Sequence, residues 1–553
     1  MAAVIHKRLL PTEIERLKQL RRRNIWKYGR GILTLAIFFG MFVFSCNNII
    51  SYEQGIISTT FMLSENIPVP VLEMRPANGA TNLVAVIAYP FSGSKEFMPR
   101  LGIELTHAGI TSYLFDLPGY GESPVPLTDE NLSQPFRQEN TTALEEVVNY
   151  IRSRHNTSQP PSILLVGYST GATTVSDYLE ADHEEFNLVS TILLSPTNQD
   201  VLVDKTPKNL LILTGQYDPS EPTANRIIQR FCKHAARGNM LTTECGNPAI
   251  GTGIREVILP FLNNSMLPIV ESTFQAILNW VHSAYPQVAD RNKMWFDIYI
   301  FWLLFAVVGI YLATFPLCSL LIRIFNIHSI PIVFPRWNRF FIYIYLLLSI
   351  PISIIIYLVW PPFRFIRILT VDDLIGYFFC IAAITTFFML LTRRILPFPL
   401  FRQAIRQFLV GALLSLFLYL TLGRLALFPW SPFSFTASGL WRFGVIFILL
   451  WPVFMFYEGV TRGFLERRTL FWRWSYYSLK ALFLISLFIF LFLIPVPGKE
   501  LFSTTWPVLV LLFLLLETCC SRLYKQGRAA IAGATVSACM MAWVFSTLFP
   551  FIR

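Results

Sequence analysis

The chain has 553 residues and a net charge of +11, and 54% of its residues are hydrophobic. Long apolar runs dominate residues 295–553, whereas residues 52–290 are mixed and hold most of the acidic side chains. Apolar runs of bilayer length exclude a wholly soluble protein. The basic excess flanks these runs without a basic helix or an aromatic platform, so we expect membrane lipids and no nucleic acid as partners.

The N-terminal segment, residues 1–31, is a basic tail that precedes an apolar run at 32–50. Its basic side chains are Lys7, Arg8, Arg16, Lys18, Arg21, Arg22, Arg23, Lys27 and Arg30. The basic region is long and no A-x-A cleavage site follows it, so the pattern favours an uncleaved transmembrane anchor over a signal peptide.

Apolar strands alternate with helical segments throughout residues 52–290. This alternation predicts an α/β fold, a mostly parallel sheet with helices on both faces. In such a sheet the functional residues gather at the carboxyl ends of the strands. The predicted strands cover 83–90, 111–116, 162–169, 189–196, 209–218 and 255–260, and the predicted helices cover 98–109, 143–154 and 268–283.

Three motifs follow strands of this domain in order. They are "DLPGYGES" at 116–123, "GYSTG" at 167–171 and "LILTGQYDP" at 211–219. The second has the form G-x-S-x-G, a sharp strand-to-helix turn that lifts a serine above a sheet. Together the motifs resemble those of the α/β-hydrolase superfamily over about residues 84–281. The resemblance implies an α/β-hydrolase fold and a serine hydrolase that works through an acyl-enzyme.

The same resemblance implies roles for four residues. Ser169 would be the nucleophile and Asp218 the acid of the catalytic triad, with Asp200 as an alternative acid. The backbone amides of Thr170 and Phe91 would form the oxyanion hole. No cofactor is implied, and no Cys/His spacing indicates a metal site.

The histidine of the triad is missing from its expected place. The loop 259–268, "LPFLNNSMLP", follows the last strand and contains Asn263 and Asn264 instead. Asparagine has no titration near neutral pH, so it cannot take the serine proton. His234, in a helical stretch after Asp218, is an alternative base that a lid-like excursion would have to bring over the site. The sequence leaves open whether the domain is active.

Two cysteines, Cys232 and Cys245, belong to this domain. In an oxidising compartment they could form a disulfide, although spacing alone does not establish the geometry.

The second half, residues 295–553, contains about eight further apolar segments. Basic loops between them alternate in phase with the basic N-terminus, which predicts a cytoplasmic N-terminus and an extracytoplasmic α/β domain and C-terminus. The predicted spans are 296–322, 340–360, 374–392, 408–428, 443–461, 481–497, 505–521 and 529–550.

One stretch of this half, "FYEGVTRGFLERR" at 456–468, is similar to the E-E-x-x-x-R motif of CAAX-protease membrane proteins. Tyr457 stands where that motif has its first glutamate, and no histidine follows His328 to bind a metal. The spacing of Glu458 and Arg462 therefore predicts a charge pair on one helix face rather than a metalloprotease.

We therefore expect a multi-pass membrane protein whose outer domain is a serine hydrolase that cleaves an ester or amide. Its location favours a lipidic or envelope-associated substrate. The alternatives are a catalytically silent hydrolase fold used for binding or as a scaffold, and an accessory domain of a transporter or lipid-handling protein.

Overall fold

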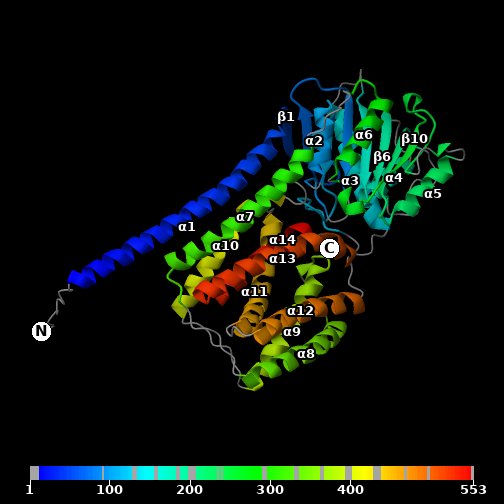
Figure 1. Ribbon diagram of the computed structural model, residues 1–553. Coiled ribbons are helices and arrows are strands. Elements are labelled where there is room, and N and C mark those ends of the chain that lie inside the picture. The colour runs from blue at the N-terminus through cyan, green and yellow to red at the C-terminus, as the bar shows by residue number, and fades with distance from the viewer. Residues whose placement is uncertain are drawn as a thin grey trace.

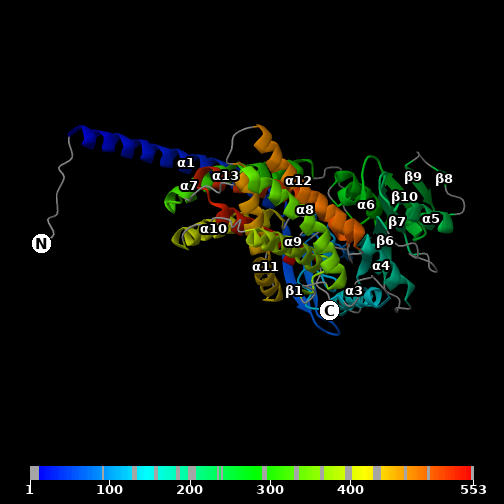
Figure 2. The same ribbon diagram turned by 90° about the horizontal axis from the view of Figure 1, so that it is seen from below.

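The computed structural model describes residues 11–549, except 90–92, 97, 128–133, 155–159, 182–186, 197–206, 233–235, 238–240, 269, 289–295, 329–335, 361–365, 393–400, 427–436, 466–469 and 495–498. A long helix, α1 (Pro11–Ser51), leads from the N-terminal end to an α/β domain (Figure 1). A group of long helices follows the domain in sequence and lies beside α1 in both ribbon views (Figure 2).

The α/β domain is built around one mixed, mostly parallel sheet. Within the described residues its ten strands have the order β1-β2-β4-β3-β5-β6-β7-β10-β9-β8. The six strands from β4 to β10 in this order are parallel, and the strands outside them pair antiparallel. The strands are β1 (Ile56–Leu63), β2 (Val69–Pro76), β3 (Leu83–Ala88), β4 (Thr111–Phe115), β5 (Ser162–Tyr168), β6 (Leu188–Leu194), β7 (Leu210–Gly215), β8 (Ala236–Arg237), β9 (Thr242–Cys245) and β10 (Ile254–Leu259).

Five helices accompany this sheet, with α2 packed beside α6 and α3 beside α4. Every residue of β3, β5 and β7 is buried, as expected for the central strands of a sheet covered on both sides. The sheet and its helices confirm the predicted fold class. The helices are α2 (Pro99–His107), α3 (Gln134–Arg154), α4 (Thr170–Glu180), α5 (Glu221–Phe231) and α6 (Glu271–Ala284).

The disulfide suggested by the cysteine count is present. Cys232, at the end of α5, is bonded to Cys245 of β9, and their Cα atoms are 5.9 Å apart. The bond therefore joins α5 to an edge of the sheet.

The α/β domain is held directly to the end of α1. The Nε2 atom of His107 lies 2.7 Å from the carbonyl oxygen of Tyr52, and the guanidinium of Arg100 stacks over the Tyr52 ring. Both contacting residues belong to α2, so the first helix of the domain rests on the residue that follows α1.

Each predicted span coincides with part of one helix of the C-terminal group. Among the described residues, seven helices of the chain are long and apolar enough to cross a membrane, namely α1, α7, α8, α9, α10, α11 and α14. Helix α12 contributes a shorter apolar stretch, Tyr476–Leu491. The helices are α7 (Phe296–Ile324), α8 (Arg336–Val359), α9 (Val371–Leu391), α10 (Phe401–Ala426), α11 (Ala437–Leu465), α12 (Leu470–Leu493), α13 (Lys499–Gly527) and α14 (Ala530–Leu548).

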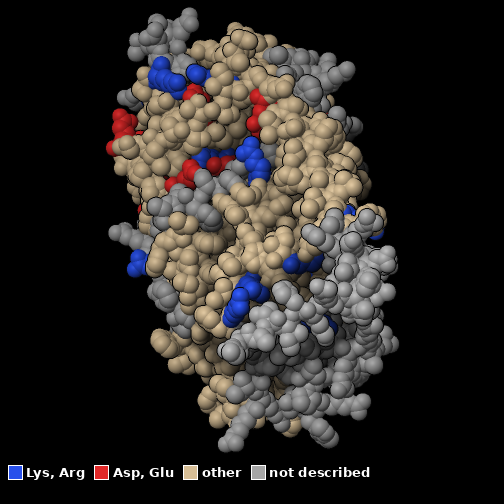
Figure 3. Space-filling view, turned by 90° about the vertical axis from the view of Figure 1, so that its left-hand side faces the viewer, with Lys and Arg blue, Asp and Glu red and all other residues tan. Residues whose placement is uncertain are grey.

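These helices expose large hydrophobic side chains, such as Ile448, Leu511 and Val359. Figure 3 shows one face of the molecule, where uncharged residues form broad areas broken by small groups of charged atoms. Such a surface suits an apolar solvent and is compatible with a multi-pass membrane protein.

Candidate active site

Ser169 occupies the sharp turn between β5 and α4. Its backbone has φ 54° and ψ −113°, a conformation that a residue with a side chain adopts only under strain. The backbone N–H of Ser169 donates to the carbonyl oxygen of Leu194 at 2.8 Å, which anchors the turn to β6. This is the geometry that a nucleophile turn requires, with the serine between the end of a central strand and the start of a helix.

The two glycines of the motif are needed because the backbone passes very close to them. A Cβ atom at Gly167 would lie 2.4 Å from the carbonyl oxygen of Gly171. A Cβ atom at Gly171 would lie 2.2 Å from the carbonyl oxygen of Ala88, the last residue of β3. The turn is therefore pressed against the loop that follows β3, which is the loop expected to supply an oxyanion amide.

Of the two predicted oxyanion-hole residues, Thr170 is the first residue of α4 and follows Ser169 directly. A backbone N–H in the first turn of a helix has no partner within the helix, so it is available to an anion. Phe91 lies outside the described residues. The residue before that gap, Tyr89, is buried, and its carbonyl oxygen would lie 2.7 Å from a Cβ atom at Gly171.

A buried ionic network holds the loop after β3, and sequence reasoning assigned it no role. The Nζ atom of Lys95 lies 2.9 Å from Asp116, 2.8 Å from Glu122 and 3.2 Å from Glu96. Asp116 also accepts hydrogen bonds from the backbone N–H groups of Lys95 and Glu122. The network therefore ties this loop to the "DLPGYGES" loop after β4.

The charges of this network depend on one another. Burial alone would lower the pKa of Lys95, but the carboxylates of Asp116, Glu96 and Glu122 outweigh burial and raise it, so the ammonium stays charged. Burial raises the pKa of Glu96, and Lys95 partly offsets that effect. The "DLPGYGES" motif drew attention to Asp116, but no local pattern marks Lys95 as its partner.

Asp218 follows β7 and is buried, and the two oxygens of its carboxylate differ in their hydrogen bonds. Its Oδ1 atom accepts hydrogen bonds from the backbone N–H of Ser220 at 2.9 Å and from the Ser220 hydroxyl at 2.8 Å. Its Oδ2 atom is buried, and no partner for it stands among the described residues. Burial and the nearby charge of Asp218 raise the pKa of Tyr168, the residue that precedes Ser169. Asp218 is therefore close to the turn that carries Ser169, and its Oδ2 atom has no hydrogen-bond partner among the described residues.

The loop after β10 lies beside the same turn, as the family pattern requires. The Tyr168 hydroxyl donates to the carbonyl oxygen of Asn264 at 2.6 Å, and the backbone N–H of Tyr217 donates to the carbonyl oxygen of Leu262 at 2.8 Å. Asn264 begins a short 3-10 helix, Asn264–Met266. The loop therefore occupies the expected place, and it brings asparagines there instead of a histidine.

The described histidines make their contacts elsewhere. His107 contacts Tyr52, and the Nδ1 atom of His282 lies 2.8 Å from the carbonyl oxygen of Val288. His328 is exposed after α7. The alternative base His234, together with His155 and His183, lies outside the described residues, as does the alternative acid Asp200. No described histidine is hydrogen-bonded to Ser169 or Asp218.

The pair predicted in the helical half is present and belongs to a larger buried cluster. Arg462 is fully buried, and its guanidinium lies 2.7 Å from Glu458 of α11 and 2.9 Å from Glu517 of α13. It also donates to the Tyr476 hydroxyl of α12 at 2.6 Å, and Lys480 of α12 pairs with Glu517. The cluster joins three helices, and its two cations balance its two carboxylates.

Within the described ranges, no group of three or more His, Cys, Asp or Glu side chains is arranged to hold a metal ion.

The match to a family model agrees with this fold. Residues 87–235 match the family model of the alpha/beta hydrolase fold, and no curated protein matches the chain. Similar solved structures include a cold-adapted esterase from an Arctic intertidal metagenomic library, with 13% identity, a TM-score of 0.30, and 43% of this chain and 96% of that chain covered. An esterase of Pyrococcus furiosus has 11% identity and a TM-score of 0.32, with 42% and 94% covered.

A dienelactone hydrolase of Anabaena variabilis has 15% identity and a TM-score of 0.29, with 43% of this chain and 100% of that chain covered. The family model covers the strands and turns that carry Ser169 and Asp218. This chain therefore contains a domain of the α/β-hydrolase superfamily, joined to helices that are long and apolar enough to form a polytopic membrane region.

Proposed function

We propose that this protein is a membrane-anchored serine hydrolase that cleaves an ester or amide through an acyl-enzyme at Ser169. The observation that carries the proposal is the strained backbone of Ser169, with φ 54°, at the tip of a turn that tolerates only glycine two positions before and after it, at Gly167 and Gly171. Strain of this kind costs about 1 kcal/mol or more, and it is maintained where a fold needs it for function.

The proposed reaction begins when the Ser169 hydroxyl oxygen attacks the carbonyl carbon of the substrate. A base takes the hydroxyl proton and returns it to the leaving alcohol or amine, and water then releases the acyl group by the reverse route. The N–H groups of Thr170 and Phe91 would stabilise the negative oxygen of each tetrahedral intermediate. Asp218 would orient and charge-balance the base through its Oδ2 atom, which has no partner among the described residues.

A fluorophosphonate probe tests this assignment, because it reacts with activated serines. We expect the purified full-length protein to be labelled, Ser169→Ala to lose the label, and Ser176→Ala to keep it. Ser176 is a matched control, since it is buried in α4 and its hydroxyl only donates to the carbonyl oxygen of Ala172. Labelling that survives Ser169→Ala would rule out Ser169 as the nucleophile.

The same labelling assay identifies the group that takes the proton of the Ser169 hydroxyl. His234→Ala should abolish labelling of Ser169 if that histidine takes the proton, and His155→Ala and His183→Ala serve as comparisons. Hydrolysis of p-nitrophenyl acyl esters of increasing chain length then measures whether the site prefers a lipidic acyl group.

A second candidate is a catalytically silent hydrolase fold used for binding or as a scaffold. The loop after β10 favours it, because the backbone of Asn264 is bonded to Tyr168 where the family has a histidine. Folded protein that no fluorophosphonate labels would support this candidate over the enzyme. The third possibility, an accessory domain of a transporter or lipid-handling protein, gains no support from the cluster around Arg462, because that cluster is buried and its charges are paired.

Three features support the proposed topology, with the N-terminus in the cytoplasm and the α/β domain outside it. They are the long apolar helix α1, the alternation of basic loops along the chain, and the disulfide, which forms and persists in oxidising compartments.

A further inference from the structure

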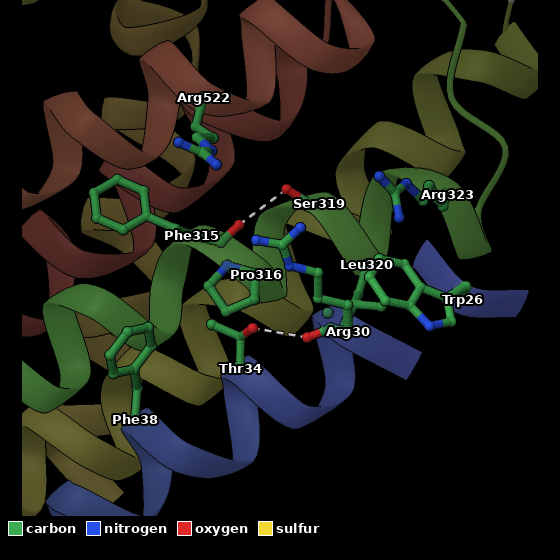
Figure 4. Close-up of a pocket in the computed structure, with 11 residues that line it drawn as sticks. Trp26, Arg30, Thr34, Phe38, Phe315, Pro316, Ser319, Leu320, Arg323 and Arg522 are labelled. Carbon is green, nitrogen blue, oxygen red and sulfur yellow. Dashed lines mark hydrogen bonds between the residues drawn. The ribbon is translucent and has the colours of Figure 1, made fainter. Parts of the chain in front are cut away.

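A cavity of about 820 Å³ lies between the middle of α1, α7 and α13 (Figure 4). Three arginines from three helices line it, namely Arg30 of α1, Arg323 of α7 and Arg522 of α13. Its other lining residues are Trp26, Gly31, Thr34, Phe38, Phe315, Pro316, Ser319 and Leu320. Among the described residues, none that lines the cavity is acidic.

The three arginines have no carboxylate partner within the described part of the chain. Two of them lie over aromatic rings, Arg323 over Tyr28 at 5.7 Å and Arg522 over Phe315 at 4.9 Å. Arg462 differs from them, since two glutamates neutralise it. Unneutralised guanidinium groups that converge on a partly apolar cavity attract anions, and their planar donors match the oxygens of a phosphate.

The lining changes in character along the cavity. Trp26, Arg30, Thr34 and Phe38 recur every fourth residue, so they form one stripe on α1 about 18 Å long. Along this stripe the indole of Trp26 is followed by the cation of Arg30, the hydroxyl of Thr34 and the ring of Phe38. Figure 4 shows the Arg30 side chain reaching from α1 toward α7, while Phe38 lies further along α1.

Helix α7 runs antiparallel to α1 and repeats this gradation. Arg323 lies beside Tyr28, and a Cβ atom at Gly31 would lie 3.4 Å from Leu320. Deeper along the pair, a Cβ atom at Gly309 would lie 3.0 Å from the carbonyl oxygen of Phe38. One end of the cavity is therefore basic and the other is mainly apolar, with Arg522 adding charge beside Phe315.

The outer face of α1 next to this stripe exposes Ile32, Leu33 and Ile37. These side chains offer a surface for acyl chains, whereas a soluble anion would gain nothing from them or from Phe38. We propose that the cavity binds the phosphate headgroup of an anionic phospholipid, with the acyl chains lying along α1. Arg30 precedes Ser51 by 21 residues, about 30 Å of helix, so this site is separate from the Ser169 site and does not depend on the proposed hydrolase activity.

Native mass spectrometry of the full-length protein in detergent tests the proposal, with phosphatidylglycerol and phosphatidylcholine as probes. We expect phosphatidylglycerol to bind more tightly. The double variant Arg30→Gln with Arg323→Gln should weaken its binding roughly 25-fold, about fivefold for each arginine removed. The control Arg402→Gln with Arg406→Gln removes the same charge from α10, outside the cavity, and should leave the affinity within about twofold of wild type.

A second variant keeps the charge and fills the space. Ser319→Trp should abolish binding of phosphatidylglycerol while all three arginines remain, and it decides the question even if the double variant fails to fold. Equal weakening by the cavity variant and the α10 control would overturn the proposal, because binding would then follow net charge. Displacement of the lipid by glycerol 3-phosphate at similar concentration would overturn the lipid assignment in favour of a soluble phosphate.

Discussion

The hydroxyl of Tyr168 donates a hydrogen bond of 2.6 Å to the backbone carbonyl of Asn264. This bond joins the residue before the proposed nucleophile to the loop in which the family places its histidine. The loop is thus held against the nucleophile turn by a backbone contact that does not require a histidine, and the fold can form whether or not the site is active.

The first prediction concerns that bond. Tyr168→Phe should lower the free energy of unfolding by about 1–2 kcal/mol, because it leaves the partly buried Asn264 carbonyl without this donor. Urea unfolding of the detergent-solubilised protein, followed by pulse proteolysis, measures the change. Tyr217→Phe is the control, since Tyr217 is 64% exposed and its hydroxyl should contribute little. Equal losses in the two variants would show that the Asn264 contact is not the cause.

The second prediction concerns backbone strain at Ser169. Glycine tolerates φ 54° without penalty, whereas alanine keeps the strain of serine. Ser169→Gly should therefore be more stable than Ser169→Ala by about 1 kcal/mol in the same unfolding assay. Glycine gives the unfolded chain more conformational freedom, which by itself lowers stability. Relief of strain at Ser169 should outweigh this loss. An alanine variant as stable as the glycine variant would therefore mean that the turn is not strained.

The third prediction concerns the network below the loop after β3. Lys95→Met should cost about 3 kcal/mol or more, because it leaves the buried carboxylate of Asp116 and the partly buried ones of Glu96 and Glu122 without their cation. Lys208→Met, at an exposed position, removes the same charge and should change stability by less than about 0.5 kcal/mol. Fluorophosphonate labelling should fall with Lys95→Met as well, since the loop it holds carries a proposed oxyanion amide.

The fourth prediction concerns pH. Burial, with a smaller contribution from Glu221, raises the pKa of Glu256 from 4.5 to about 7. The folded protein therefore holds this proton more tightly than the unfolded chain. The contribution of protonated Glu256 to the free energy of unfolding is fully present below pH 4.5. It is lost as the pH rises through about 7.

Glu256→Gln removes this dependence. The variant should match wild type near pH 4.5 and be more stable near pH 8, by at most about 3 kcal/mol. Urea unfolding between pH 4.5 and 8 measures the difference between the two proteins, which cancels the contributions of other groups. A constant difference across this range would contradict the prediction.

The fifth prediction concerns the disulfide. Cys232 and Cys245 are 13 positions apart, and opening a loop of this size should cost about 3 kcal/mol of stability. The double variant Cys232→Ser with Cys245→Ser should show this loss, and dithiothreitol should produce a similar loss in wild type. Dithiothreitol should leave the double variant unchanged. A stability loss there would point to some other reducible bond.

Local patterns were enough to predict the parallel strands and the elbow. The strands β3, β5 and β7 are continuous apolar runs that end in turn residues, and such runs are recognisable without knowledge of their neighbours. The edge strands β1 and β2 were not predicted. Most of β1 is exposed and its polar residues give no clear alternation, while β2 begins and ends next to prolines.

The helices of the C-terminal half were also predicted from local patterns. Long apolar runs between basic loops predict helices, because the thickness of a bilayer sets their length. Composition did not predict that α12 has only a short apolar stretch among the described residues, or that α13 carries Glu517 into a cluster with Arg462 and Lys480. The partners of a buried charge lie on other helices, so no sequence window contains them.

Chain-local chemistry thus specified the domain order, the fold class, the glycine-flanked serine and the absence of histidine from the loop after β10. Tertiary packing alone determined that Lys95 pairs with Asp116 and that the Tyr168 hydroxyl donates to the Asn264 carbonyl. It also determined that Oδ2 of Asp218 is buried without a partner among the described residues. The cavity shared by Arg30, Arg323 and Arg522 likewise depends on how the helices pack. The reason is physical. Periodicity and turn chemistry act between residues a few positions apart, whereas these contacts join groups that come together only when separate strands and helices pack.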